Sequence, residues 1–312
     1  MLGGMTHGIM FHHFHSSKHA KRPGSISASD LDSMISYLKD SFSILSPYEF
    51  IRDVENGRLN ESSIVLTFDD ALLSQFDVAL PVLESHGIRG IFSIYSSVFG
   101  GKPDPLEIFA AFRQSNFGHF DEFFVAFERA VLTNATPLLG RRDFEYPVSY
   151  LAEFPFYSDK ERNFRYLRDE VLGPEIYSEI MWTLIKQSED FDLDAEISAL
   201  WMTTGNLKVL RDSGHHIGMH SHTHPTRMDF LSESEQRWEY ETNHSWIVRE
   251  LDLAPSVVAH PCGRYSEATL KILSDLGARI GFRSSLTDGP FGTALEIPRE
   301  DHANIYREMV AA

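Results

Sequence analysis

Two groups of acidic and imidazole side chains, far apart in the chain, have the types and spacing that bind a divalent metal ion. Asp69 and Asp70 stand side by side directly after an apolar segment, and five of the fifteen histidines lie between residues 215 and 224. Within that cluster, an extended chain would hold His220 and His224 about 13 Å apart, whereas one helical turn brings Cβ atoms to about 5 to 6 Å. These two histidines can therefore share one ion only if the chain turns between them.

Each group also has an ordinary structural explanation. Aspartate is favoured at a helix N-terminus, where it accepts hydrogen bonds from unpaired backbone N–H groups, and a histidine-rich stretch can simply be a surface loop. Against this, adjacent carboxylates raise each other's pKa, so burying two of them is costly unless they are used. One carboxylate as a metal ligand and its neighbour as a proton acceptor is a consistent division of roles. Taken alone, the histidine cluster leaves both explanations open, whereas the acidic pair by itself is better explained as a helix N-terminus.

The elements that must position these side chains alternate between strand and helix. Apolar, β-branched segments predict strands near residues 8–14, 63–68, 91–95, 217–219, 257–259 and 280–282, and helical patterns cover residues 31–38, 74–85, 206–211, 233–251 and 267–276. Repeated alternation of this kind favours a parallel sheet whose ligand-binding loops lie at the carboxyl ends of its strands. We therefore predict an α/β fold, a distorted (β/α) barrel of about seven strands.

The middle of the chain has a different pattern. Between about residues 103 and 205 helical spacing dominates, with phenylalanines at positions 109, 112, 120, 123, 124 and 127. Such a stripe could line a ligand groove, but aromatic residues at this spacing more often form packed core, which is our prediction. We expect residues 1–102 and 206–312 to form the barrel and residues 103–205 to be a helical insertion in one loop. The insertion is expected to act as a lid or dimer contact, so that a homo-oligomer could form through it.

The composition excludes several classes of protein. The 312 residues include 28 Lys and Arg against 45 Asp and Glu, a net charge of −17, which disfavours binding to nucleic acid and to anionic membranes. A single cysteine, Cys262, rules out an intramolecular disulfide and a multi-cysteine metal site. The sequence contains neither an apolar run long enough for a membrane span nor a signal-like start, so a cytoplasmic location is expected.

Considered together, the two groups of side chains resemble the metal-dependent polysaccharide deacetylases, the carbohydrate esterases related to chitooligosaccharide deacetylase. The segments that carry the resemblance are VLTFDD at 65–70, GMHSHTHP at 218–225 and AHPCGRYSEATLKILSDLG at 259–277. In addition, GIMFHHFH at 8–15 and LEIPRED at 295–301 resemble a branch of the family with an N-terminal Tyr-His motif. The resemblance covers residues 8–100 and 206–302.

The resemblance implies a metal site and a base. Asp70, His220 and His224 match the Asp-His-His triad that binds the ion in this family, and Asp69 matches the catalytic base. One carboxylate and two imidazoles suit Zn²⁺, and Co²⁺, Ni²⁺ and Fe²⁺ fit the same ligands. The implied cofactor is thus one divalent ion, with zinc favoured.

The remaining roles follow from three further segments. His12 matches the histidine of the Tyr-His motif, the family's general acid. Pro261 and Gly263 flank Cys262, whose backbone N–H would then contact the oxyanion. Arg299 matches an arginine that supports the catalytic carboxylate. Three other histidines are alternatives for the acid role: His13, His222 and His302.

This chain departs from the family pattern at three places. Ala71 follows the two acids where the family usually has glycine, which affects the local turn. Cys262 stands where the family usually has an aromatic residue of the sugar pocket. The arginine expected shortly before the Pro-Gly motif is not visible, and His260 occupies the neighbouring position.

The activity implied is hydrolysis of the N-acetyl group of an amino sugar, such as a precursor of a surface polysaccharide. Two alternatives remain. The same metal site could serve an amidase acting on a non-sugar C–N bond, or the chain could be a catalytically inactive barrel that binds carbohydrate or protein. The expected partner is an N-acetylated sugar, with no nucleic acid and no membrane span.

Overall fold

The computed structural model describes residues 8–22, 24–103, 105–134, 145–150, 158–284 and 292–311. The chain divides into two compact units, one formed by residues 1–104 and 199–312 and the other by residues 105–198. The first unit contains the strands, and the described part of the second is helical.

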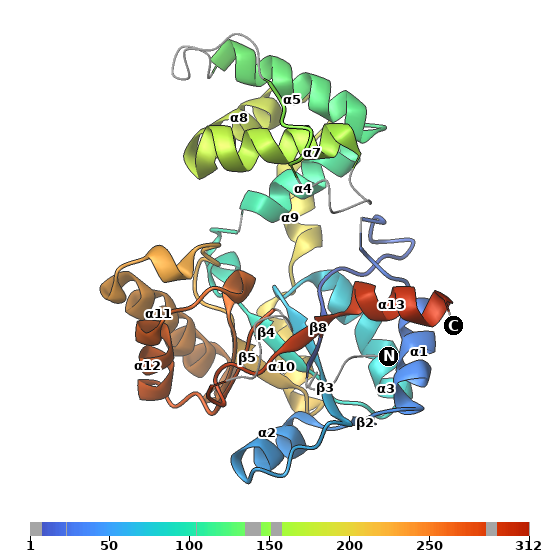
Figure 1. Ribbon diagram of the computed structural model, residues 1–312, viewed down its shortest axis with the longest axis vertical. Helices are drawn as coiled ribbons and strands as arrows, with labels where there is room; N and C mark the ends of the chain where they lie inside the picture. Colours follow the sequence, from blue (N-terminus) through green and yellow to red (C-terminus); the bar gives the residue numbers. More distant parts are fainter. Residues whose placement is uncertain are drawn as a thin grey trace. The chain divides into compact units, whose positions relative to one another are not determined.

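The first unit is built around a sheet of parallel strands (Figure 1). Their order across the sheet is β7-β6-β5-β4-β3-β1-β8, and the short β2 pairs with β3 outside this path. The strands are β1 (Gly8–Phe11), β2 (Ser43–Ile44), β3 (Ser63–Asp69), β4 (Ile91–Ile94), β5 (His216–Met219), β6 (Val257–Ala259), β7 (Ile280–Phe282) and β8 (Arg299–Asp301).

The segment before β8 joins the two ends of this sheet. Phe282 of β7 forms a parallel bridge with Ile297, and the Ile297 N–H donates to the Gly281 carbonyl at 2.8 Å. A side chain at Gly281 would collide with the carbonyl of Leu295, so glycine permits this close approach. The seven strands thus form a nearly closed barrel, which confirms the predicted fold class.

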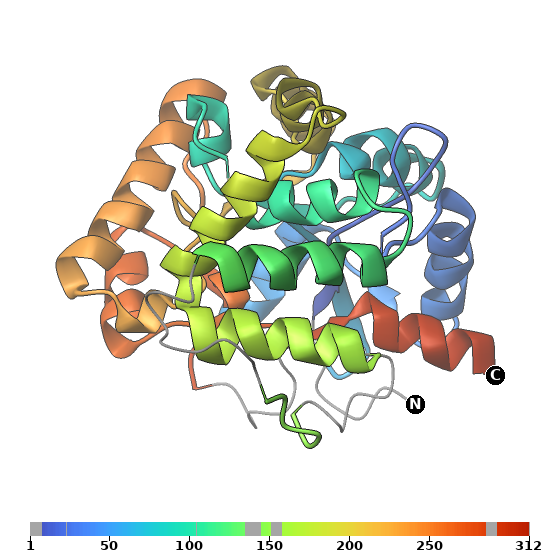
Figure 2. The same cartoon turned by 90° about the horizontal axis from the view of Figure 1, so that it is seen from above.

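Helices follow most of the strands. They are α1 (Ala28–Lys39), α2 (Pro47–Glu55), α3 (Leu80–Ser85), α10 (Thr204–Asp212), α11 (Glu233–Leu251), α12 (Glu267–Asp275) and α13 (His302–Ala311), with a π-helical turn at Gln75–Ala79 and 3₁₀ turns at Ser97–Gly100, Met228–Phe230 and Pro261–Gly263. Serine or threonine caps begin many of them; α11, for example, starts behind a capping box of Ser232 and Glu235. Helices α13 and α1, from opposite ends of the chain, lie side by side (Figure 2).

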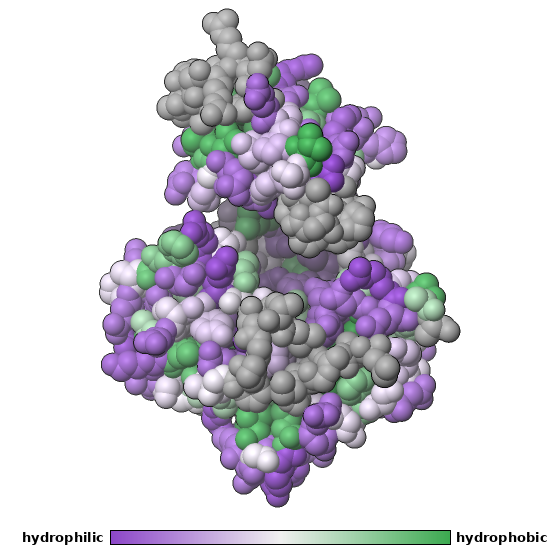
Figure 3. Space-filling model, viewed as in Figure 1, coloured by the Kyte–Doolittle hydropathy of each residue, from purple (hydrophilic) through white to green (hydrophobic). Residues whose placement is uncertain are grey.

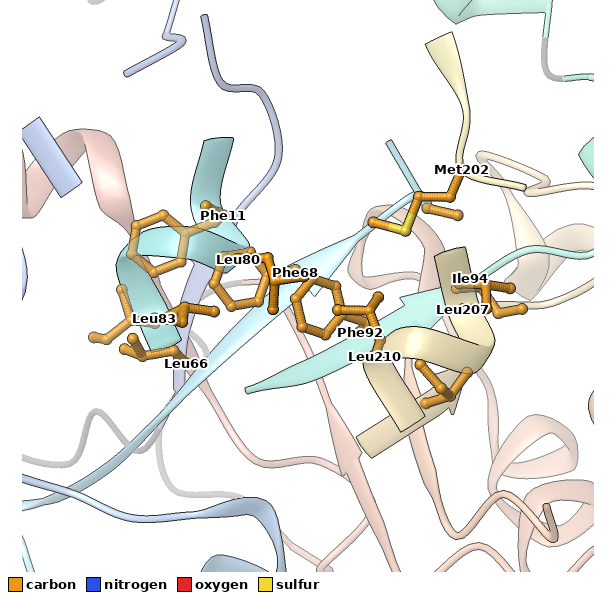
Figure 4. Close-up of a cluster of buried hydrophobic side chains, with 14 of the residues drawn as sticks. Phe11, Leu66, Phe68, Leu80, Leu83, Phe92, Ile94, Met202, Leu207 and Leu210 are labelled. Atoms are coloured by element: carbon orange, nitrogen blue, oxygen red, sulfur yellow. The ribbon is translucent and has the colours of Figure 1, made fainter. Parts of the chain in front are cut away.

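Alternate side chains of the strands point outward into an apolar layer beneath the helices. Phe11, Phe68 and Phe92, from the neighbouring strands β1, β3 and β4, form a row of stacked rings with centroid separations of 5.2 and 4.6 Å (Figure 4). Leucines of α3 and α10 belong to the same buried cluster: Leu80, Leu83, Leu207 and Leu210. This layer attaches the helices to the barrel wall.

The other alternate side chains face the barrel interior, which changes character along its length. A second apolar cluster contains residues from β3, β4, β6 and β7 together with two residues of α2: Val65, Ile91, Val257, Ile280, Phe282, Phe50 and Ile51. On β3, Thr67 and Asp69 follow Val65 on the same face. The interior therefore becomes polar toward the carboxyl ends of the strands, where the two acids lie.

The second unit is helical in all of its described residues that have regular structure. Its helices are α4 (Pro105–Ser115), α5 (Phe120–Asn134), α7 (Asp159–Tyr166) and α8 (Gly173–Gln187), with a π-helical turn at Leu167–Leu172, and α9 (Leu193–Leu200) leads out of it. Five of the predicted stripe's phenylalanines are buried: Phe109, Phe112, Phe123, Phe124 and Phe127. The prediction that the stripe is packed core is confirmed.

The surface is mixed in character. On the face in Figure 3 apolar residues are scattered among hydrophilic ones. None of the helices in the described ranges combines the length and apolar composition that crossing a bilayer requires.

Candidate metal centre and active site

The two acids lie where β3 ends and the chain turns sharply. Asp69 is the last residue of β3, and the next two residues, Asp70 and Ala71, have φ values of 78° and 55°. This left-handed region costs an L-residue about 1–3 kcal/mol, whereas glycine adopts it freely. The structure thus explains why glycine suits position 71. The Ala71 turn is held by its carbonyl, which accepts from the Met202 N–H at 2.8 Å.

The histidine loop follows β5 and reverses direction without forming a helix. Ser221 and His224 have φ values of 65° and 57°, and the His224 N–H donates to Ser221 Oγ at 3.1 Å. The ring centroids of His220 and His224 are 4.9 Å apart. The chain therefore turns between the two histidines, as sharing an ion requires, and left-handed residues, not a helical turn, make this reversal.

The structure brings three of the predicted ligands together. Asp70 Oδ1 lies 3.3 Å from His220 Nε2 and 3.6 Å from His224 Nε2, and one ligand atom of each residue lies within 4.8 Å of the others. Two ligands about 2.0–2.1 Å from a tetrahedral ion stand about 3.3–3.4 Å apart. Asp70 Oδ1 is buried and receives no hydrogen bond from any described residue. These three side chains therefore fit a divalent ion.

Hydrogen bonds and charges prepare these groups for a cation. His220 Nδ1 lies 2.7 Å from the Ala259 carbonyl, to which it must donate, so in the neutral ring Nε2 keeps the lone pair with which a histidine binds a metal ion. Burial would raise the pKa of Asp70, but His220, His224 and His12 outweigh it and hold that pKa well below its usual range. Asp70 is accordingly ionised.

Asp69 forms a buried ion pair with Arg299. The guanidinium reaches both carboxylate oxygens, Nη1 to Oδ1 at 3.0 Å and Nη2 to Oδ2 at 2.7 Å. Two further donors of Arg299, on Nη1 and Nε, are used by Thr67 Oγ1 and the Arg283 carbonyl, each at 3.1 Å. Burial would raise the pKa of Asp69, but Arg299 foremost holds it below its usual value. The pairing keeps a carboxylate ionised and oriented beside the candidate metal centre.

A glycine makes room for this arginine. Gly8 of β1 is in register with Arg299 of β8. A Cβ added at Gly8 would lie 2.7 Å from the Arg299 Cγ and 3.3 Å from the Phe282 ring. The position therefore requires glycine for the arginine to cross the barrel interior.

Among the candidates for the general acid, His12 is the one that lies beside Asp70. It follows β1, and its Nε2 lies 3.9 Å from Asp70 Oδ2. Burial lowers the pKa of His12, against the raising effect of Asp70 and Asp69. Two of the alternative acids are engaged elsewhere: His222 Nδ1 lies 2.9 Å from Ser96 Oγ, and the buried His302 ring lies 3.1 Å from the Met10 carbonyl and 2.8 Å from that of Gly24. The third, His13, is adjacent to His12 in the chain.

The segment Pro261–Gly263 forms a 3₁₀ turn directly beyond β6. Cys262 is exposed with a φ of 53°, and Gly263, with a φ of 66°, has no space for a side chain beside Ser284. The preceding His260 is fully buried; its Nε2 lies 2.8 Å from the Leu295 carbonyl and its ring stacks on Tyr265. His260 thus supports the turn from inside the fold. The contact of the Cys262 amide with an oxyanion remains a prediction.

Two buried polar residues of α11, Glu239 and Asn243, were assigned no role from the sequence. Glu239 Oε2 accepts from the backbone N–H groups of His222 at 2.8 Å and Thr223 at 2.7 Å. One turn further along the helix, Asn243 Oδ1 accepts from the His220 N–H at 3.2 Å. Together they attach the histidine loop to the helix.

A signal for these residues is present in the sequence. Gln236, Glu239 and Asn243 recur at three- and four-residue spacing, and all three are buried. A buried helix face is normally apolar, so polar residues repeated along it indicate specific partners.

Comparisons with known proteins agree with this site. A sequence model of the family described as "Polysaccharide deacetylase" matches residues 195–281, which include both candidate histidine ligands. No curated protein sequence matches the chain significantly. The resemblance proposed from the sequence is confirmed by this match, and the N-terminal Tyr-His detail stays a prediction.

Solved structures share the fold. A deacetylase PplD of Streptococcus pyogenes in complex with acetate has a TM-score of 0.56 and 16% identity, covering 95% of this chain and 92% of that chain. IcaB from Ammonifex degensii has a TM-score of 0.58 and 16% identity, covering 99% and 97%. The BpsB deacetylase domain from Bordetella bronchiseptica has a TM-score of 0.53 and 13% identity, covering 96% of each chain. At these identities the likeness shows the fold.

Proposed function

We propose that this protein is a metal-dependent hydrolase that removes the N-acetyl group from an amino sugar, such as a precursor of a surface polysaccharide. The observation that carries the proposal is the convergence of Asp70, His220 and His224 on one point, next to the carboxylate of Asp69. The family match over residues 195–281 supports the deacetylase class, and the names of the solved relatives point the same way.

We assign the catalytic barrel to residues 1–102 and 206–312 and the helical insertion to residues 103–205. Asp70, His220 and His224 would hold one divalent ion, Zn²⁺ in the first place, with Co²⁺, Ni²⁺ and Fe²⁺ compatible with the same donors. When bound, such an ion supplies Lewis-acid polarisation of the amide carbonyl and activation of water.

The chain's own residues would supply the proton transfers. Asp69, ionised and oriented by Arg299, accepts the proton of the attacking water. His12 donates a proton to the leaving nitrogen, because cleavage of the C–N bond without it would expel an unstable amide anion. The backbone N–H of Cys262, in the turn shaped by Pro261 and Gly263, donates to the developing oxyanion.

The products of this reaction are acetate and a free amino sugar. The test is therefore acetate release from a panel of N-acetylated mono- and oligosaccharides and of non-sugar N-acyl compounds, with the metal content of the protein measured in parallel. We expect turnover of N-acetyl sugars by the metal-loaded protein. Turnover of only non-sugar amides would instead assign an amidase, and metal-loaded protein inert toward every compound would assign a binding barrel.

A further inference from the structure

We propose that Glu239 of α11 is a positioning residue that holds the loop between the two histidine ligands in its ion-binding conformation. The inference rests on the proposed function only in taking His220 and His224 as ligands. It assigns to α11, which lies within the residues matched by the family model, a part in ion binding that the ligand triad does not include.

The contacts of Glu239 converge on the middle of the loop. One carboxylate oxygen, Oε2, accepts from two consecutive backbone N–H groups, those of His222 and Thr223. The other oxygen, Oε1, accepts from the Thr223 hydroxyl at 2.5 Å. Glu239 is only 4% exposed, so these charge-assisted hydrogen bonds are shielded from water. A buried carboxylate is therefore used mainly to orient a short piece of backbone.

That piece of backbone does not hold its conformation by itself. Ser221 and His224, on either side of the segment that Glu239 contacts, both have left-handed φ values. Such residues persist only where the surroundings enforce them. If the peptide between His222 and Thr223 rotated, the His224 ring would move relative to the His220 ring. By fixing this peptide, the Glu239 carboxylate helps to set the distance between the two imidazoles.

The same helix holds the other end of the loop through a different group. The His220 N–H donates to the Ile94 carbonyl at 3.0 Å and to Asn243 Oδ1 at 3.2 Å, and Asn243 Nδ2 donates to the same carbonyl at 3.1 Å, so Asn243 reinforces the junction between the ends of β5 and β4. Asn243 therefore adds to the backbone pairing that places His220 on the barrel wall, and Glu239, four residues earlier on the same face, places the turn that returns to His224. The two anchors together set the ligand geometry.

The test is the affinity of the whole protein for Zn²⁺, measured by competition with a chromophoric chelator. We expect Glu239→Ala to weaken Zn²⁺ binding by about 10- to 100-fold, the usual effect of removing a group that orients metal ligands. Glu239→Gln should recover most of the affinity, because its amide oxygen can accept from both N–H groups while its NH₂ donates to the Thr223 hydroxyl. A matched control is Glu241→Ala on the same helix, whose exposed side chain pairs with Arg237; wild-type affinity is expected.

A second readout separates positioning from simple stabilisation. The Co²⁺-loaded protein should show an altered visible absorption spectrum in Glu239→Ala and a wild-type spectrum in the control, since that spectrum reports the ligand geometry. If Glu239→Ala does not fold, Thr223→Val removes the hydroxyl contact alone and should weaken Zn²⁺ binding a few-fold. Undiminished Zn²⁺ affinity in these variants, with only a lowered melting temperature of the metal-free protein, would overturn the proposal. A wild-type protein that binds none of Zn²⁺, Co²⁺, Ni²⁺ and Fe²⁺ would overturn the proposed function as well.

Discussion

The barrel and the helical unit differ in what they bury. All of the buried polar and charged side chains among the described residues belong to the barrel unit, including Asp69, His220, Glu239 and Arg299. In residues 105–198 the fully buried side chains of the described part are apolar or aromatic, such as Phe123 and Phe127.

This difference indicates that the functional site lies in the barrel unit. Burying a polar or charged group costs free energy unless it is paired, so a fold retains such groups where they serve a site or a turn. The core of the helical unit is explained by packing, with the Arg113 guanidinium lying over the Phe123 and Phe164 rings. If the two units differ in this way, substitutions of the site residues in the barrel should change activity, and substitutions in the core of the helical unit should change stability alone.

The largest effect is expected from Asp69→Asn in the barrel. Turnover should fall at least about 10³-fold because the amide cannot accept the proton. Zn²⁺ should still bind, since Asp70, His220 and His224 suffice to hold it. Rates of acetate release and bound metal per chain measure both effects. Loss of metal in this variant would contradict the separate roles of the two acids.

In the helical unit, Phe127→Ala should act on stability alone. The ring is fully buried among Phe123, Phe164 and Tyr177, so its removal should lower the free energy of unfolding by about 3–5 kcal/mol. Urea denaturation measures this loss, with the exposed Val125→Ala on the same helix as a control of small effect. Zn²⁺ affinity of the folded protein should not change; a large change would break the separation between the units.

The variant His12→Ala tests whether His12 is the general acid that protonates the leaving nitrogen. We expect a rate about 10²-fold below wild type with little change in metal content, because His12 contacts Asp70 from outside the ligand set. Acetate release and metal analysis give both quantities. Unchanged turnover would transfer the acid role to another histidine, with His13 the next to be substituted.

The smallest effect concerns the pH dependence of barrel stability. Burial, with a contribution from Arg89, lowers the pKa of His215 to about 4, and its Nδ1 accepts from the Gly90 N–H at 3.0 Å, which requires the neutral ring. Between pH 6.5 and 4 the unfolded chain binds a proton at this residue that the folded protein does not. Stability is therefore lost as the pH falls through this range, by about 1–2 kcal/mol at pH 5.

Urea denaturation at pH 7 and pH 5 checks this expectation. The variant His215→Asn keeps an acceptor oxygen for the Gly90 N–H but does not titrate, so its stability should depend less on pH than that of the wild type. An equal dependence in both proteins would assign the acid sensitivity to other groups.

Much of the barrel was predictable because its signals are local. The apolar segment before Asp69 and the Ser232 and Glu235 cap of α11 both depend on neighbours within a few residues. Short elements without strong periodicity were not predicted, among them β2, β8 and α2, because pairing or packing in the folded state defines them.

The candidate site was predictable in its residues but not in its geometry. The types and spacing of Asp69, Asp70, His220 and His224 indicated metal chemistry, and similarity indicated the reaction. The left-handed turn at Ser221 could not be predicted, since non-glycine residues adopt it only when contacts from elsewhere enforce it.

By itself the sequence determined the alternating fold, the apolar core of the helical middle and the chemical types available for catalysis, because each depends on side-chain chemistry and short-range periodicity. Only the tertiary structure decided that Asp70 meets His220, 150 positions later, that Arg299 reaches Asp69 across the barrel, and that α11 supports the histidine loop. Closure of the barrel brings the carboxyl ends of distant strands together, and that closure is a property of the whole chain.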